Sequence, residues 1–183
     1  MLAKGFGGTR IQDVAEELDV SNGLIHYHFA SKDDLLAETL RYAADADIRR
    51  LEKSVASGAN AVQKLDRVLR EYLPGARDHS WLLWIDAWGE GLRNARLRDI
   101  SEELDQSWVG LLASVVRDGI DEGVFRCSDP LGAAWRLASM MDGLGLQVVL
   151  HRATMSRDEM LLHARHAAAV EVGIPIDALT GSQ

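Results

Sequence analysis

The chain has little of what secreted and membrane proteins need. Its single cysteine, Cys127, cannot form an internal disulfide, so we expect a reducing compartment and an ordinary loop thiol rather than a reactive one. The most apolar region is interrupted by Asp86, Glu90 and Arg93, and no run is long enough to span a membrane. The first residues lack the basic start and apolar stretch of a signal peptide. These absences predict a cytoplasmic protein without a membrane partner.

The patterns of common catalytic and metal sites are also missing. There is no glycine-rich phosphate loop, no nucleophile elbow and no CxxC pair. His163 and His166 are three residues apart on one predicted helix, with Asp142 and His151 upstream, and that spacing permits a metal site. No second half of such a site is evident, so surface histidines are the preferred interpretation. We expect no enzyme activity, no catalytic or metal-binding residues and no cofactor.

Positive charge is scarce, which is unfavourable for binding nucleic acid through bulk electrostatics. The net charge is −8 at pH 7, whereas affinity for DNA draws heavily on neutralising phosphates. Residues 1–41 carry four basic against seven acidic residues. DNA binding by this segment therefore requires that its acids face away from DNA, or that further basic residues precede it.

What is present, over residues 9–32, is the pattern of two short helices joined by a tight turn. Thr9 and Gln12 have the spacing of a capping box. Asp19 is expected to take the left-handed conformation of the turn, and Ser21 to cap the second helix. An apolar face on the first helix is predicted from Ile11, Val14, Ala15 and Leu18. The second helix carries groups suited to a DNA groove, namely Asn22, Gly23, His26, Tyr27 and His28.

The segment IQDVAEELDVS, followed by GLIHYHFASKDDLL, resembles the helix-turn-helix of the TetR family of dimeric repressors. The resemblance implies that a recognition helix ends at Phe29 and that its exposed side faces operator DNA. Asparagine can pair with adenine, and lysine with a phosphate. The residues that the resemblance places against bases or phosphates are Arg10, Gln12, Asn22, Gly23, Leu24, His26, Tyr27 and Lys32.

Three departures from the family pattern bear on DNA binding. His26 stands where the family usually has tyrosine, with Tyr27 one residue later, which shifts the expected base contacts. Asp19 replaces the usual turn glycine. Only Met1–Lys4 remain of the family's first helix, so we expect residues before Met1 in the native protein. A genuine start at Met1 would favour the alternative, a helical dimeric ligand-binding or interaction protein without DNA-binding activity.

The rest of the chain is predicted to be helical, with breaks at glycine and proline. The expected helices cover residues 32–55, 60–73, 80–93, 97–122, 131–151 and 156–172. Ser156 and Glu159 have the spacing of a second capping box at the start of the last helix, which is expected to end before Gly173. WLLWIDAWGEGLRNARLR, DGIDEGVFR and MMDGLGLQVVLH resemble a regulatory domain of the BetI-like type within the same family. The fold class is therefore all-α, with a DNA-binding helix-turn-helix domain at residues 1–42 and a helical-bundle domain for ligand binding and dimerisation at residues 43–183.

Three tryptophans, Trp81, Trp84 and Trp88, form a stripe on one predicted helix. They could line a pocket for a partly apolar or cationic molecule, since indole faces attract quaternary ammonium groups; the plainer interpretation is a large-residue core. Asp86 and Glu90 could supply negative charge, but a solvated face is favoured for both. The predicted ligand-binding residues are Tyr72, Trp84, Trp88, Trp108 and Met140.

The helix over residues 131–151 is apolar on nearly every side, so it must be buried on two sides. We expect a homodimer, with a central helix of a monomer as the alternative. The predicted interface residues are Leu137, Met141, Leu144, Val148 and His163. A symmetric dimer would place two recognition helices in successive major grooves, about 34–36 Å apart.

These features together predict a homodimeric transcriptional repressor. Its expected partners are a palindromic double-stranded operator, read by Asn22–Phe29, an unknown small-molecule effector, and a second copy of the chain. The effector would favour a dimer with the wrong spacing between its recognition helices, and the operator would then be released.

Overall fold

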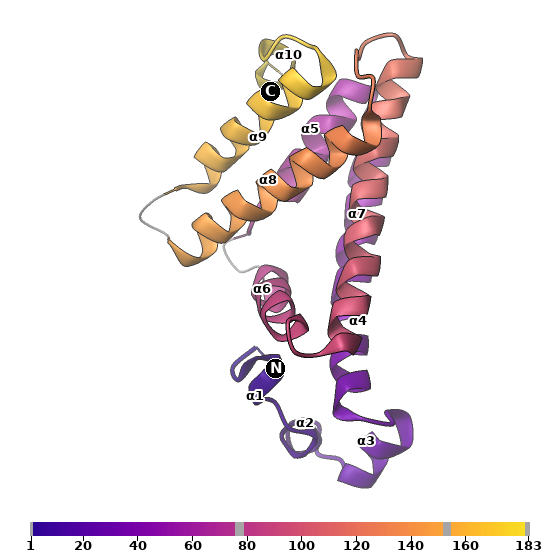
Figure 1. Ribbon diagram of the computed structural model, residues 1–183, viewed down its shortest axis with the longest axis vertical. Helices are drawn as coiled ribbons and strands as arrows, with labels where there is room; N and C mark the ends of the chain where they lie inside the picture. Colours follow the sequence, from indigo (N-terminus) through magenta and orange to yellow (C-terminus); the bar gives the residue numbers. More distant parts are fainter. Residues whose placement is uncertain (1, 76–78, 152–154, 182–183) are drawn as a thin grey trace. The chain divides into compact units, whose positions relative to one another are not determined.

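The computed structural model in Figure 1 describes residues 2–75, 79–151 and 155–181, which contain ten helices and no strand. The all-α prediction is confirmed, and the six long helices begin and end within two residues of their predicted bounds. The helices are α1 (Gly5–Gly8), α2 (Ile11–Glu17), α3 (Asn22–His28), α4 (Lys32–Ala56), α5 (Ala61–Glu71), α6 (His79–Gly91), α7 (Ala95–Asp121), α8 (Pro130–Leu150), α9 (Arg157–Val172) and α10 (Asp177–Thr180). Within the described residues, every helix is too short or too polar to cross a lipid bilayer.

The helix ends are fixed by side chains that accept backbone hydrogen bonds. Asn60 and Asp129 cap α5 and α8, each accepting an N–H bond at 2.9 Å from the residue three positions later. The predicted capping box of α9 is confirmed, because the Ser156 hydroxyl accepts from the N–H of Glu159 and the Glu159 carboxylate accepts from the N–H of Ser156. Gly173 ends α9 in the left-handed conformation, at φ 66°.

The chain folds into two compact units, and neither is continuous in sequence. The first unit combines residues 1–46 with 77–105, and the second combines residues 47–76 with 106–183. Helices α4 and α7 each contribute to both units. The first unit thus joins the helix-turn-helix to α6, although 22 residues of chain separate the end of α4 from the start of α6.

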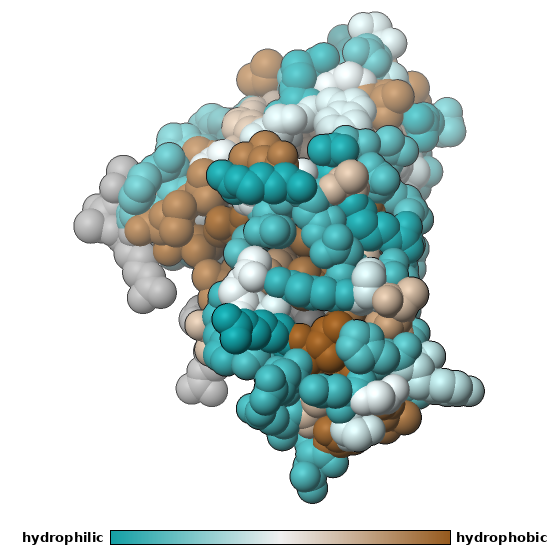
Figure 2. Space-filling model, turned by 60° about the horizontal axis from the view of Figure 1, so that its bottom comes forward, coloured by the Kyte–Doolittle hydropathy of each residue, from teal (hydrophilic) through white to brown (hydrophobic). Residues whose placement is uncertain are grey.

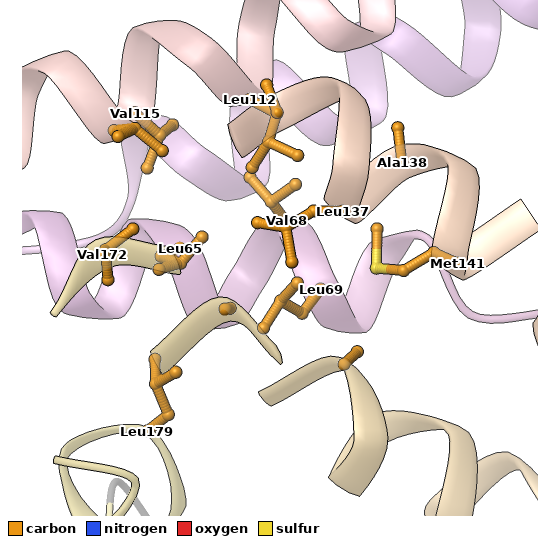
Figure 3. Close-up of a cluster of buried hydrophobic side chains, with 14 of the residues drawn as sticks. Leu65, Val68, Leu69, Leu112, Val115, Leu137, Ala138, Met141, Val172 and Leu179 are labelled. Atoms are coloured by element: carbon orange, nitrogen blue, oxygen red, sulfur yellow. The ribbon is translucent and has the colours of Figure 1, made fainter. Parts of the chain in front are cut away.

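The core of the second unit is built from α4, α5, α7, α8 and α9 and is closed by α10. Figure 3 shows Leu65, Val68 and Leu69 of α5 beside side chains of α7, α8 and α9. Leu137 and Met141 of α8 lie in this core and are 1% and 0% exposed. Their burial within the chain corrects the prediction that they contact a second copy, because other elements of the same chain already cover them.

A buried ion pair fixes α9 to α5. The carboxylate of Asp66, which is buried, accepts hydrogen bonds from Nε of Arg70 at 2.7 Å and from Nε of Arg165 at 2.8 Å. Arg70 lies one turn along α5, whereas Arg165 comes from α9. Nη2 of Arg165 is also 2.7 Å from Asp66, but it makes no well-aligned hydrogen bond. One carboxylate therefore holds two guanidinium groups.

Candidate functional site

Helices α2 and α3 are joined by a reversal at Leu18–Ser21. Asp19 has a φ of 52° and is the single described non-glycine residue with positive φ, so the predicted left-handed turn is confirmed. The N–H of Val20 then donates to the carbonyl of Ala15 at 3.0 Å, and this bond closes the end of α2. Ser21 caps α3 as expected, since its hydroxyl accepts from the N–H of Leu24 at 3.2 Å.

The conformation of Asp19 gives a first testable prediction. Aspartate tolerates positive φ through its short polar side chain, whereas a β-branched residue does not. We expect Asp19→Val to be less stable than Asp19→Gly by about 1–2 kcal/mol in free energy of unfolding, measured by urea denaturation at one protein concentration. Equal stability of the two variants would show that the turn relaxes to negative φ.

The start of α2 differs from the prediction. The Thr9 hydroxyl donates to the carbonyl of Gly5 at 2.6 Å, and Thr9 is 2% exposed. The N-terminal turn of α2 is held instead by Asp13, which accepts from the N–H of Arg10 at 2.8 Å. Gln12 is bonded to Glu16 at 2.8 Å. The predicted Thr9–Gln12 capping box is therefore wrong, because α1 takes the Thr9 side chain.

A small apolar cluster packs the buried side of α3 against α2 and α4. Its buried members are Ala15, Ile25 and Leu35, one each from α2, α3 and α4. The partly buried members are Ile11, Val14, Val20 and Phe29. Leu18 was expected on this face but is 60% exposed, because it lies past the last helical residue of α2.

The remainder of α3 is open to solvent. Its predicted DNA-facing residues Asn22, Gly23, Leu24, His26 and Tyr27 are all exposed. Tyr27 is 82% exposed, and its ring meets the ring of His28 edge-on at 5.1 Å between centroids. A short helix held by one buried residue, Ile25, thus leaves its other sides exposed to solvent.

The predicted phosphate-contacting residues are in mixed positions. Arg10 is exposed, and Gln12 is held by Glu16. The Lys32 ammonium donates to the carbonyl of Gly7 at 2.9 Å, and this bond links α4 to α1 within the first unit. Lys4 forms an ion pair with Asp13 at 2.7 Å, and its hydrogen bond is the main reason why the pKa of Asp13 is lowered.

Helix α1, which sequence reasoning did not predict, links the helix-turn-helix to α6. Phe6 is fully buried, and its N–H donates to the carboxylate of Asp86 in α6. Gly5 has φ 68°, and a Cβ there would lie 3.0 Å from Asp86 Oδ1. A Cβ on Gly7 would lie 2.8 Å from Glu90 Oε2. Asp86 and Glu90 therefore contact α1 rather than forming the freely solvated face that was expected.

The predicted ligand residues fall in different units. Trp84 and Trp88 lie on α6 in the first unit, with ring centroids 5.8 Å apart, and Trp88 also meets Trp81 edge-on at 6.4 Å. Tyr72 and Trp108 lie in the second unit.

In the second unit the ring centroids of Tyr72 and Trp108 are 5.5 Å apart, in an edge-to-face arrangement. Met140 packs against the core of that unit. The Tyr72 hydroxyl donates to the carboxylate of Asp142 in α8 at 2.5 Å. The sequence analysis considered Asp142 only as part of a possible metal site with the histidines. A single acidic residue in an otherwise apolar helix could also have marked it as a candidate functional residue.

The exposed apolar side chains of α8 and α9 are ones that the sequence analysis did not name as interface residues. Leu144 and Val148 are partly buried against the chain's own core, and His163 on α9 is exposed. The apolar side chains left exposed on these helices are Leu131, Trp135, Leu150, Leu162 and Val170, with Val170 at 82%. Figure 2 shows such hydrophobic surface, in brown, at the left of the view.

Among the described residues, no group of three or more histidine, cysteine or acidic side chains could hold a metal ion.

Two family models match the chain. One describes bacterial regulatory proteins of the tetR family and covers residues 1–39, and the other describes the C-terminal domain of BetI-type transcriptional repressors and covers residues 61–172. The HTH-type transcriptional regulator YfiR of Bacillus subtilis (strain 168) is 26% identical over 148 residues, which are 77% of this chain and 70% of that protein.

Two solved structures extend the likeness. A transcriptional regulator from Saccharomonospora viridis, in complex with choline, has a TM-score of 0.79 and 35% identity, and the match covers 90% of this chain and 87% of that one. FadR from Bacillus subtilis, in complex with stearoyl-CoA, has a TM-score of 0.76 at 19% identity, covering 93% and 91%, which shows the shared fold.

Proposed function

The chain belongs to the TetR family of bacterial transcriptional regulators, with a C-terminal domain of the BetI type, and from this membership we propose that it is a homodimeric repressor of a palindromic operator. This family consists of regulators, not enzymes. Residues 1–42 would bind DNA through Asn22–Phe29, and residues 43–183 would bind an effector and dimerise. The observation that carries the proposal is the exposed face of α3, held on a buried Ile25 within the segment that matches the family's DNA-binding domain.

Homodimerisation is proposed because α8 and α9 leave apolar side chains in water. Trp135 and Leu150 on α8, with Leu162 and Val170 on α9, are between 44% and 82% exposed. Exposed apolar surface of this kind on neighbouring helices marks a protein–protein contact. A second copy fits it by symmetry, and the operator's two half-sites require two recognition helices.

Release by an effector requires that α6 and the DNA-facing helices move together. Asp86 on α6 accepts the N–H of Phe6 on α1, and α6 also carries the tryptophan stripe. An effector that shifts α6 would act on α1 and, through it, on the spacing of the recognition helices. The effector must bind the released state more tightly for this to work. The regulator in complex with choline makes choline the first compound to test, while FadR with stearoyl-CoA illustrates that the fold alone does not choose the ligand.

The DNA half of the proposal is tested by selecting bound sequences from a random duplex pool and then measuring His26→Ala and Tyr27→Ala on the selected operator. A side chain that contacts a base edge should lose about 1–3 kcal/mol of binding and relax the preference at one position. Uniform weakening on every sequence would instead mark a phosphate contact. Failure to enrich any sequence would favour the alternative, a dimeric ligand-binding protein without DNA-binding activity.

A further inference from the structure

Three of the four basic side chains in residues 1–41 have partners within the chain. Lys4 and Arg41 form ion pairs with acids, and the Lys32 ammonium donates to a backbone carbonyl. Among the described residues of this segment, Arg10 is the basic side chain that remains, exposed and in no ion pair. Little permanent positive charge is therefore free to meet a phosphate backbone.

Helix α3 itself, over Asn22–His28, contains no lysine or arginine. Its basic side chains are His26 and His28, both in the last turn and both exposed. Among the described residues, neither imidazole forms an ion pair with a carboxylate, and the ring of His28 meets only the neutral ring of Tyr27. The charge of the face that is proposed to meet DNA thus depends on the protonation of two histidines.

The elements packed against α3 carry mainly acids. Three of these acids have partners of their own, since Asp13 accepts from Lys4, Glu16 from the amide of Gln12, and Asp34 from the hydroxyl of Ser31. Carboxylates repel phosphates, so positive charge on the imidazoles would offset that repulsion when DNA approaches. The charged groups on α2, on the turn after it and on the first turns of α4 are Asp13, Glu16, Glu17, Asp19, Lys32, Asp33, Asp34 and Glu38.

The field of DNA acts directly on an imidazole. Histidine changes charge between pH 5 and pH 8, and nearby negative charge favours its protonated form. Duplex DNA carries one negative charge per about 1.7 Å of its axis. A protonated imidazole donates through both ring nitrogens, whereas a neutral one donates through one. DNA binding and protonation of these side chains must therefore favour each other, because linkage is reciprocal.

We propose that operator binding takes up protons at His26 and His28, so that this regulator binds its operator more tightly as the pH falls. The inference rests on the proposed function, because it concerns the same contact between α3 and DNA. The charged imidazoles are favoured in the complex, so their contribution is present at pH 6 and is lost as the pH rises toward 8. His28, which was not among the residues assigned to DNA, becomes one of them.

The test uses the duplex that the full chain enriches from a random pool at pH 6. Its affinity is measured by fluorescence anisotropy at pH 6, 7 and 8 and at one ionic strength, because salt also changes DNA affinity. We expect the affinity to fall about 10- to 100-fold from pH 6 to pH 8, with a factor of ten for each unit by which DNA shifts the titration of one imidazole. Isothermal titration at pH 7, in two buffers of different ionisation enthalpy, should show a net uptake of protons.

Two double variants test whether charge is the cause. His26→Gln with His28→Gln should bind with an affinity that no longer changes with pH, because neither side chain can be protonated. His26→Lys with His28→Lys should also lose the pH dependence but bind more tightly than the glutamine variant, since its charge is permanent. The matched control is His79→Gln, at an exposed histidine of the same unit that begins α6, and it should keep the full pH dependence.

The outcomes separate this inference from the proposed function. Circular dichroism shows whether each variant is folded, and the proton uptake of the unmodified protein decides the matter without any variant. Equal affinity at pH 6 and pH 8, no proton uptake, or a full pH dependence in the glutamine variant overturns the inference and leaves the proposed repressor standing. A pool that yields no enriched duplex at either pH overturns both.

Discussion

Replacing Asp66 with alanine is expected to lower the free energy of unfolding by about 3–5 kcal/mol. Asp66 is buried and holds Arg70 and Arg165, and Arg165 has a side chain only 12% exposed. Without the carboxylate, a guanidinium charge stays in the contact between α5 and α9 with nothing to neutralise it. The measurement is urea denaturation followed by circular dichroism, at one fixed protein concentration because association shifts apparent stability.

The control for Asp66 is the exposed ion pair between α8 and α9. Glu171→Gln removes a carboxylate that holds Arg136 in two hydrogen bonds, but solvent screens this pair, so its loss should be far smaller. The double variant Asp66→Ala with Arg165→Met should regain much of the stability, because the unpaired charge is then gone. A loss from Asp66→Ala no larger than that from Glu171→Gln would mean that water or another group compensates Arg165.

Two glutamates on α9, Leu162→Glu with Val170→Glu, are expected to convert the proposed dimer into a monomer. Both side chains lie on the exposed side of α9, and a symmetric interface would bring each charge against its copy. Operator binding should fall at least about 100-fold, because each half-site is then bound separately. Analytical ultracentrifugation gives the oligomeric state, and a gel-shift titration gives the affinity.

Leu92→Glu is the matched control for the interface variant. Leu92 is 80% exposed, directly after α6, and belongs to the first unit rather than to α8 or α9. The same change of chemistry there should leave the dimer intact. A dimeric double variant with unchanged operator affinity would place the interface on another surface of the chain.

Local signals in the sequence predicted most of the fold because each depends on a few neighbouring residues. The αL turn at Asp19, the capping box of Ser156 with Glu159 and the left-handed end of α9 at Gly173 all appear where the sequence places them. Backbone hydrogen bonds at helix ends must be satisfied nearby, so these features can be recognised without knowing the tertiary structure.

The wrong or missing predictions depend on contacts between distant segments. Thr9 has the right spacing for a helix cap, but its hydroxyl donates to the backbone carbonyl of Gly5 in α1 instead. Leu137 and Met141 were assigned to a partner because α8 is apolar on every side, and periodicity cannot say which side its own chain covers. The hydrogen bond between Tyr72 and Asp142 was not predicted, because it joins residues seventy positions apart. The DNA-facing assignments of α3 remain predictions.

The division of the first unit into two chain segments has a consequence for synthesis on the ribosome. Residues 1–46 contain the whole helix-turn-helix, yet the N–H of Phe6 donates to the carboxylate of Asp86, and Arg41 is paired with Glu103 at 2.7 Å. Chains emerge from the N-terminus and domains fold as units. A nascent chain that has emerged only as far as residue 46 therefore lacks the partners that complete this unit, which can assemble only after about residue 105 has left the exit tunnel.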